Sequence, residues 1–295
     1  MRCLLALTLL LSPLPASAAE DILIDLHAGR QEGIFFKSPV RQRAILIPPD
    51  KKSQTALLFF RGWPGIARIE SIKDKTRNLI PFLGQREQQF KDAGIALVIV
   101  DCPTDEWGQP GPNPTACSDE YRSSGRHLAD VRLILKELKE KFGYTRFFVL
   151  GHSYGTISSK WLALGLGSEI AGSIHSAAMT SPAGEGDRYG CSVLDFPLAD
   201  IKTPTLHIHH QDDACYVTPY RMVRNYATDN LVTVRGGTPG GNPCRGHFHS
   251  YDGRATEVAT AIIDWIIDGR ISPLVGAANK ATPDGSIPAD GGPAR

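Results

Sequence analysis

Residues 146–156 read RFFVLGHSYGT, and this stretch decides the fold. The apolar residues at 147–150 predict a β-strand over 146–150, and the periodicity of 156–166 predicts a helix directly after it. Between them GHSYG, residues 151–155, has the Gly-x-Ser-x-Gly pattern, which places a serine on a sharp strand-to-helix turn. Side chains at either end of this pattern would collide with neighbouring atoms, so both positions need glycine. Ser153 is therefore predicted to expose its hydroxyl above the sheet as a nucleophile.

Short apolar runs alternate with helical patterns along the rest of the chain. Further strands are predicted at 44–47, 56–60, 95–100, 170–174, 205–209 and 231–234, and helices at 83–93, 127–142 and 256–267. This order predicts an α/β fold in which helices cover both faces of a mostly parallel sheet. No internal repeat or linker divides it, so we expect one domain over residues 19–275. The connection at 180–200 is short, which predicts that there is no large cap domain.

The N-terminus has the pattern of a signal peptide. Arg2 precedes an apolar run at 4–11, and residues 16–18 read Ala-Ser-Ala, a typical cleavage site. We expect removal of residues 1–18 and export to the periplasm or the medium. The apolar run is too short for a stable membrane anchor, so no membrane insertion is expected after processing. Residues 276–295 are rich in Gly, Pro and Ala and are predicted to be a disordered tail.

Composition and charge are those of an ordinary globular protein and give no sign of a nucleic-acid partner. Hydrophobic residues make up 42% of the 295 residues, enough for a core of ordinary size. The formal net charge is +1 and the basic residues are scattered, which argues against nucleic-acid binding. No cofactor-binding motif occurs, so no cofactor is expected. The oligomeric state leaves no signal in the sequence.

The acid and the base of a nucleophilic serine are expected late in the chain. Where the serine occupies such a turn, the acid and then a histidine follow it in chain order. A predicted strand ends in HIHHQDD, residues 207–213, and Asp213 is favoured over Asp212 because it lies further out on the loop. The loop before the last helix holds two candidate bases, His247 and His249, and spacing alone leaves that choice open.

The same cluster permits a metal-site interpretation. His207, His209, His210 and Asp213 are possible ligands, and the first two share one face of a strand. The chain order explains Asp213 without a metal, however, and no metalloprotease motif is present. We therefore expect no metal and interpret the histidines as strand residues whose ring nitrogens are satisfied.

Two backbone N–H groups are the candidate oxyanion hole. One belongs to Tyr154, the residue after the nucleophile. The other is expected in FRGWPG, residues 60–65, which follow the strand at 56–60. Trp63 is the candidate donor, because Gly62 permits a sharp turn and a proline at position 64 has no N–H. The alternative is a plain Gly/Pro turn.

With these residues in view, the chain resembles the α/β-hydrolase superfamily over residues 43–267. It is similar in particular to uncharacterised exported bacterial serine hydrolases. The matching stretches are YRSSGRHLAD at 121–130, GHSYGT at 151–156, LDFPL at 194–198, HHQDDAC at 209–215 and, with Cys244 before it, HSYDG at 249–253. The last corresponds to a family pattern H-G-F-x-G, in which Ser250 replaces the glycine. The resemblance favours His249 over His247 as the base.

The resemblance also implies disulfides. Five of the six cysteines remain after processing, so at least one is left over from pairs within the chain. Cys215 is implied to pair with Cys244, because both flank the acid and base loops. Cys102 and Cys117 are candidates for a second bridge, which leaves Cys191 over.

The implied activity is hydrolysis of an ester-type bond in a small-molecule acyl substrate. An acyl-enzyme would form on Ser153, with His249 as base and Asp213 orienting it. Peptidase, thioesterase and lactonase reactions use the same chemistry. A catalytically silent binding protein on the same fold is the alternative from another class, because fold does not determine function.

Overall fold

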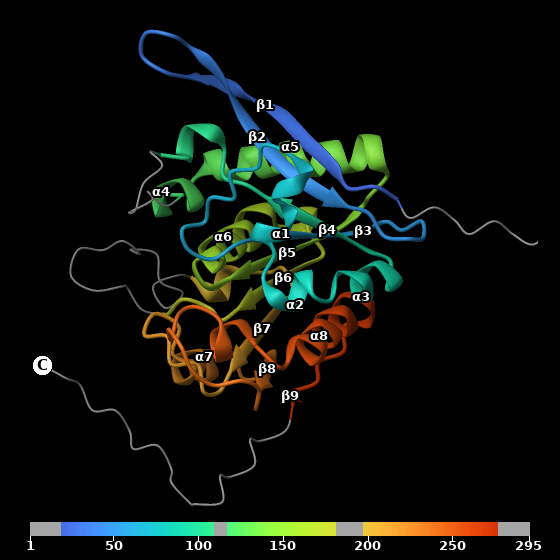
Figure 1. Cartoon of the computed structure of the whole chain (residues 1–295), viewed down its shortest axis with the longest axis vertical. Helices are drawn as coiled ribbons and strands as arrows, with labels where there is room; N and C mark the ends of the chain where they lie inside the picture. The colour runs from blue at the N-terminus through green and yellow to red at the C-terminus, as the bar shows by residue number, and fades with distance from the viewer. Residues whose placement is uncertain (1–18, 109–116, 181–196, 277–295) are drawn as a thin grey trace, which may run out of the picture.

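The computed structural model describes residues 19–108, 117–180 and 197–276. Three predictions lie outside this part of the chain: the signal peptide at 1–18, the tail apart from Gly276, and the state of Cys191. The described residues form one sheet with helices on both sides, as predicted (Figure 1). None of the helices in this part of the chain is long and apolar enough to span a membrane.

The sheet has nine strands in the order β1-β2-β4-β3-β5-β6-β7-β8-β9, which run from top to bottom in Figure 1. β2 pairs antiparallel with β1 and with β4, and every other neighbouring pair is parallel. The strands are β1 (Ile22–Glu32), β2 (Ser38–Ile47), β3 (Thr55–Phe60), β4 (Ile95–Val100), β5 (Arg146–His152), β6 (Gly172–Ser176), β7 (Thr205–His210), β8 (Leu231–Val234) and β9 (Leu274–Val275).

The helices divide between the two faces of the sheet. α5 and α6 pack on one face, and α2, α3 and α8 pack on the other (Figure 1). The helices are α1 (Lys75–Asn78), α2 (Pro81–Gly84), α3 (Glu87–Asp92), α4 (Asp119–Arg122), α5 (Gly125–Phe142), α6 (Thr156–Leu166), α7 (Tyr220–Tyr226) and α8 (Ala255–Asp268). No cap domain occurs among the residues that the structure describes.

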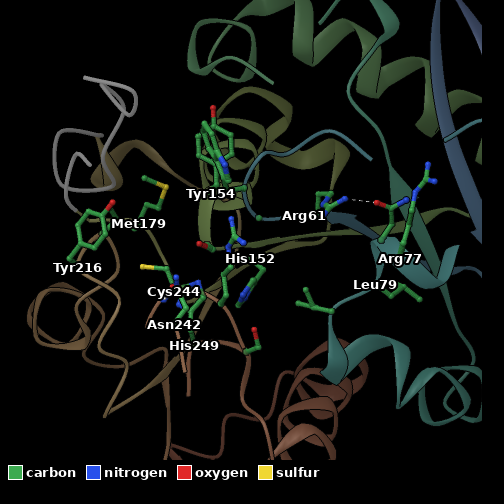
Figure 2. A pocket seen from close by; sticks show the side chains of 18 residues that line it. Arg61, Arg77, Leu79, His152, Tyr154, Met179, Tyr216, Asn242, Cys244 and His249 are labelled. Carbon is green, nitrogen blue, oxygen red and sulfur yellow. Dashed lines mark hydrogen bonds between the residues drawn. The ribbon is translucent and has the colours of Figure 1, made fainter. Parts of the chain in front are cut away.

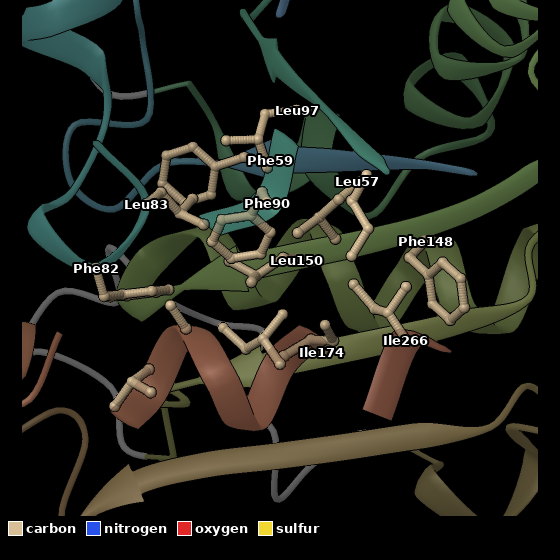
Figure 3. Close-up of a cluster of buried hydrophobic side chains, with 14 of the residues drawn as sticks. Leu57, Phe59, Phe82, Leu83, Phe90, Leu97, Phe148, Leu150, Ile174 and Ile266 are labelled. Atoms are coloured by element: carbon tan, nitrogen blue, oxygen red, sulfur yellow. The ribbon is translucent and has the colours of Figure 1, made fainter. Parts of the chain in front are cut away.

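The central strands are apolar throughout because both of their faces are covered. Successive side chains of a strand point to opposite faces. In β3, Leu57 and Phe59 pack toward α8, whereas Leu58 and Phe60 pack toward α5 and α6. Figure 3 shows the first of these two layers, in which Ile266 of α8 faces the sheet. Each such side chain contributes about 1.5–3 kcal/mol when it is fully buried.

Several elements differ from the sequence prediction. The helix predicted at 83–93 is wrong as one element, because a turn at residues 85–86 separates α2 from α3. β1 was not predicted, since its apolar run is only three residues long, at 22–24, and apolar residues alternate with polar ones after it. β2 begins six residues before the predicted strand for the same reason. α7 was also missed, because its only buried residue is Val223 and no apolar face marks it.

Asp101, directly after β4, fixes the chain that follows β3. Its carboxylate accepts hydrogen bonds from the backbone N–H groups of Ala67 (2.7 Å), Ile69 (2.7 Å) and Cys102 (2.8 Å). Because a buried carboxylate needs such partners, these bonds tie residues 67–69 to the end of β4. The preceding turn at residues 62–65 is thereby held over the carboxyl ends of the parallel strands, where sites of α/β proteins lie.

Candidate active site

Ser153 lies on the turn between β5 and α6, with a backbone φ of 53°. Few residues other than glycine adopt this left-handed conformation. A methyl group on Gly151 would collide with the backbone of Gly155, and one on Gly155 would collide with the carbonyl of Phe60. The two glycines thus allow β5, α6 and the end of β3 to approach closely enough to form the turn.

The turn at residues 62–65 lies against the serine. A Cβ atom on Gly62 would be 3.4 Å from the Cβ of Ser153. The Gly65 N–H donates to the Gly62 carbonyl (2.8 Å), and the Trp63–Pro64 peptide bond is cis. The buried guanidinium of Arg122 donates to the Gly65 carbonyl (3.1 Å). Trp63 and Tyr154 are adjacent, with ring centroids 5.4 Å apart.

Asp213 and His249 are in direct contact. Nδ1 of His249 is 2.9 Å from Oδ2 of Asp213, and both side chains are almost completely buried. The same oxygen accepts from the Thr218 hydroxyl (3.0 Å), and Oδ1 accepts from the Cys215 N–H (2.9 Å). Burial raises the pKa of Asp213, but hydrogen bonds from His209 and His249 outweigh it and hold the pKa below the usual value. Asp213 is therefore a carboxylate at neutral pH.

His209 is a partner of the acid that the sequence did not indicate. Its Nε2 is 2.7 Å from the Thr218 carbonyl and 3.3 Å from Oδ2 of Asp213. A carbonyl only accepts, so Nε2 carries the proton. The contact joins His209 of β7 to the loop that follows this strand and folds back against it. The spacing of residues along the strand does not predict such a contact.

His152, next to the nucleophile, is also buried. Its Nδ1 is 3.0 Å from the Ser176 hydroxyl, and its ring centroid is 5.1 Å from that of His249. Burial holds the pKa of His152 well below the usual value, and a charge on His249 would lower it further. His152 therefore stays neutral. A neutral ring does not repel a positive charge on the adjacent His249 ring.

The competing candidates lie elsewhere. Asp212 is exposed, and its N–H donates to Nδ1 of His210 (3.0 Å). His247 packs beside Gly241 and is not among the residues that line the cavity containing Ser153. The expectation that the strand histidines are fully satisfied is wrong for two atoms, because Nδ1 of His207 and Nδ1 of His209 have no hydrogen-bond partner. No cluster suited to a metal ion occurs among the described residues.

Ser153 and His249 line one cavity of about 410 Å³. Figure 2 shows it with His152 near the centre, Met179 and Tyr216 on one side and Arg61 on the other. Gly62, Trp63 and Tyr154 are also part of its wall. The structure therefore brings the predicted nucleophile, base and oxyanion-hole residues to one space, with Asp213 directly behind the base.

Two disulfides are present in the described chain. Cys215 and Cys244 are bonded, with their Cα atoms 4.6 Å apart, and Cys102 is bonded to Cys117. The first bond joins the loop that contains Asp213 to the segment that precedes His249. It restricts how far the acid and the base can separate, because the two loops share a covalent link only two and five residues away from them.

Gly155→Ala should lower the free energy of unfolding by about 1–3 kcal/mol or more, because the added methyl group meets the Phe60 carbonyl in a packed interior. Urea denaturation followed by circular dichroism measures the change. Gly125→Ala is the matched control, since a methyl group there has nothing within 4 Å and alanine suits the first turn of α5. Equal stability of Gly155→Ala and wild type would contradict this account of the turn.

Comparison with known proteins gives structural matches only. No protein-family model and no curated protein matches the sequence. Est1E from Butyrivibrio proteoclasticus is similar in structure, with 14% identity and a TM-score of 0.53 over 78% of this chain and 95% of that one. Its complex with ferulic acid matches at 15% identity and a TM-score of 0.53, over 78% and 96% of the two chains. The Pyrococcus furiosus esterase Pf2001 matches at 12% identity and a TM-score of 0.52, over 84% and 91%.

Such low identities establish the fold alone. Over 78% and 84% of this chain, Est1E and Pf2001 share its overall arrangement of strands and helices. The chain has the α/β-hydrolase fold.

Proposed function

We propose that this protein is a serine hydrolase that cleaves an ester bond in a small acyl substrate through an acyl-enzyme. The observation that carries the proposal is the contact between Asp213 and His249 behind a cavity that Ser153 also lines. Nucleophile, base and orienting acid are the three parts that acyl transfer by serine requires. They come from three separate loops, which argues against a chance arrangement on a silent scaffold.

His249 acts as the general base. Because its Nδ1–H donates to the Asp213 carboxylate, its Nε2 has a free lone pair that can accept the proton of Ser153. The Ser153 oxygen then attacks the ester carbonyl, and His249 returns the proton to the leaving alcohol. Water repeats the sequence and releases the acid. The negative charge of Asp213 stabilises the imidazolium during each transfer, and the hydrogen bonds from Thr218 and Cys215 hold that carboxylate in place.

The tetrahedral oxyanion needs two N–H donors. We assign them to the backbone of Tyr154 and of Trp63. Tyr154 directly follows the nucleophile and lies two residues before α6 begins, at the helix end whose N–H groups favour negative charge. Trp63 stands in the turn that packs against Ser153, and Arg122 holds that turn through Gly65.

An ester is the favoured substrate because one structural match, Pf2001, is named as an esterase and another, Est1E, has ferulic acid bound. Peptide, thioester and lactone substrates remain separate arms of the assay, since the same residues serve them. A silent binding protein predicts that none of these arms shows turnover.

Ser153→Ala should reduce hydrolysis of 4-nitrophenyl butyrate by about 10³-fold or more, because the acyl-enzyme cannot form. Release of nitrophenolate by the protein without its first 18 residues gives the rates. A fluorophosphonate probe should label wild type and not the variant. Turnover by wild type without labelling, or undiminished turnover by Ser153→Ala, would rule out Ser153 as the nucleophile.

In the same assay His249→Ala should lose activity while His247→Ala keeps it.

We also infer export. The two disulfides in the structure are the kind of bond that persists in oxidising compartments, and residues 16–18 match a cleavage site. When the full chain is expressed in a bacterium, N-terminal sequencing of the mature protein should begin near Ala19. Recovery of the chain in the cytoplasm with Met1 in place would contradict export.

A further inference from the structure

The wall of the active-site cavity has charge of one sign. Its lining includes three arginines, Arg61, Arg77 and Arg245, and no Asp or Glu among the described residues. The protein as a whole is close to neutral, with a formal charge of +1, so this asymmetry belongs to the cavity and not to the chain. Positive charge gathered in a concave site attracts anions.

Arg61 directly precedes Gly62, the residue whose turn packs against Ser153. Its Nη1 donates to Oδ1 of Asn78 (2.6 Å) and to the Ile66 carbonyl (3.3 Å), both of which are uncharged. No ion pair joins Arg61 to another described residue. Burial lowers the pKa of Arg61; the charge of Asp101 partly offsets this, while Arg77 and Arg122 add to it. A partly buried guanidinium thus faces the cavity without an anionic partner in contact.

The other two arginines differ in how far they are neutralised. Arg77 forms an ion pair with Asp74 (3.0 Å), so its charge is partly compensated. Arg245 is exposed, follows Cys244 directly, and forms no ion pair with any residue in the described ranges. Arg245 therefore adds an exposed positive charge, without an ion pair to the described residues, to the cavity wall, whereas Arg61 supplies a partly buried donor that Asn78 holds in place.

The side of the cavity opposite Arg61 is lined by mainly apolar side chains. Met179 and Tyr216 lie across from Arg61, with His152 between them (Figure 2). Val217 packs in one cluster with Met179 and also lines the cavity. A substrate that spans the cavity meets a cationic group at one end and apolar side chains at the other, and Ser153 and His249 line the same cavity.

From these contacts we propose that the ester accepted here carries an anionic group, a carboxylate or another oxyanion of similar size, which Arg61 binds. The apolar part of the substrate lies against Met179 and Tyr216, and Arg245 assists by attracting the anion. This inference rests on the proposed ester hydrolysis. The planar guanidinium suits the two oxygens of such a group, and its contact gains strength because the site is partly shielded from water.

Matched substrates test the proposal. Mono-(4-nitrophenyl) glutarate and its methyl ester place the charge on the acyl side; 4-carboxyphenyl butyrate and its methyl ester place it on the alcohol side. At least one anionic ester should exceed its neutral match in kcat/KM by about tenfold or more, as expected for a charge-assisted hydrogen bond. The pair that shows the preference identifies the side that Arg61 contacts. Inorganic phosphate as a competitive inhibitor tests whether a free oxyanion suffices.

Arg61→Gln should reduce this ratio to near one, chiefly through KM for the anionic ester. Arg245→Gln should lower the ratio two- to fivefold, an effect that 0.5 M NaCl should mimic because salt screens exposed charge. Arg224→Gln is the control, since that side chain is exposed on α7 outside the cavity lining and the ratio should not change. If Arg61→Gln fails to fold by circular dichroism, the ratio in Arg245→Gln and its salt dependence decide the question.

The experiments distinguish failure of the proposed anion site from failure of the proposed ester hydrolysis. Equal rates for anionic and neutral esters in both pairs, or a ratio unaffected by both arginine variants, would overturn the anion site while leaving ester hydrolysis intact. Absence of turnover for all four esters, together with absence of fluorophosphonate labelling of folded protein, would overturn ester hydrolysis itself and the anion site with it.

Discussion

The buried carboxylate of Asp213 is the constraint on which the site depends. A negative charge in a protein interior is costly unless hydrogen bonds satisfy it. Here one oxygen is contacted by His249, His209 and the Thr218 hydroxyl, and the other by the Cys215 N–H. These contacts hold together β7, the loop that follows it and the segment of His249, and the disulfide from Cys215 also links that loop to the segment before His249. The position of His249 is therefore set by the hydrogen bonds that the buried Asp213 carboxylate requires.

The parallel sheet supplies the second constraint. β3, β5 and β7 end at one edge, so the turn at residues 62–65, the serine turn and the Asp213 loop meet there. Close packing at this edge excludes side chains at Gly151 and Gly155. The arrangement of nucleophile, base and cavity wall follows from strand order combined with these two steric requirements.

The sequence predicted the central strands and the serine turn well, because continuous apolar runs and a glycine-bounded motif are local signals. It indicated Asp213 and, through resemblance, His249, and these two residues are in contact in the structure. The contact of His209 with Asp213 and the break between α2 and α3 were not predictable, since both depend on packing between distant segments. β1 was missed for another reason: after a run of three apolar residues, this edge strand alternates between apolar and polar side chains, so no long apolar run marks it.

The most direct test of the account compares two adjacent aspartates. Asp213→Asn keeps the shape of the side chain but removes the charge that orients His249, and kcat for ester hydrolysis should fall by about 10⁴-fold. Asp212→Asn, one residue away and exposed, should retain the wild-type kcat. Retention of activity by Asp213→Asn, or an equal loss in both variants, would contradict the central claim that Asp213 and His249 act as a pair on Ser153.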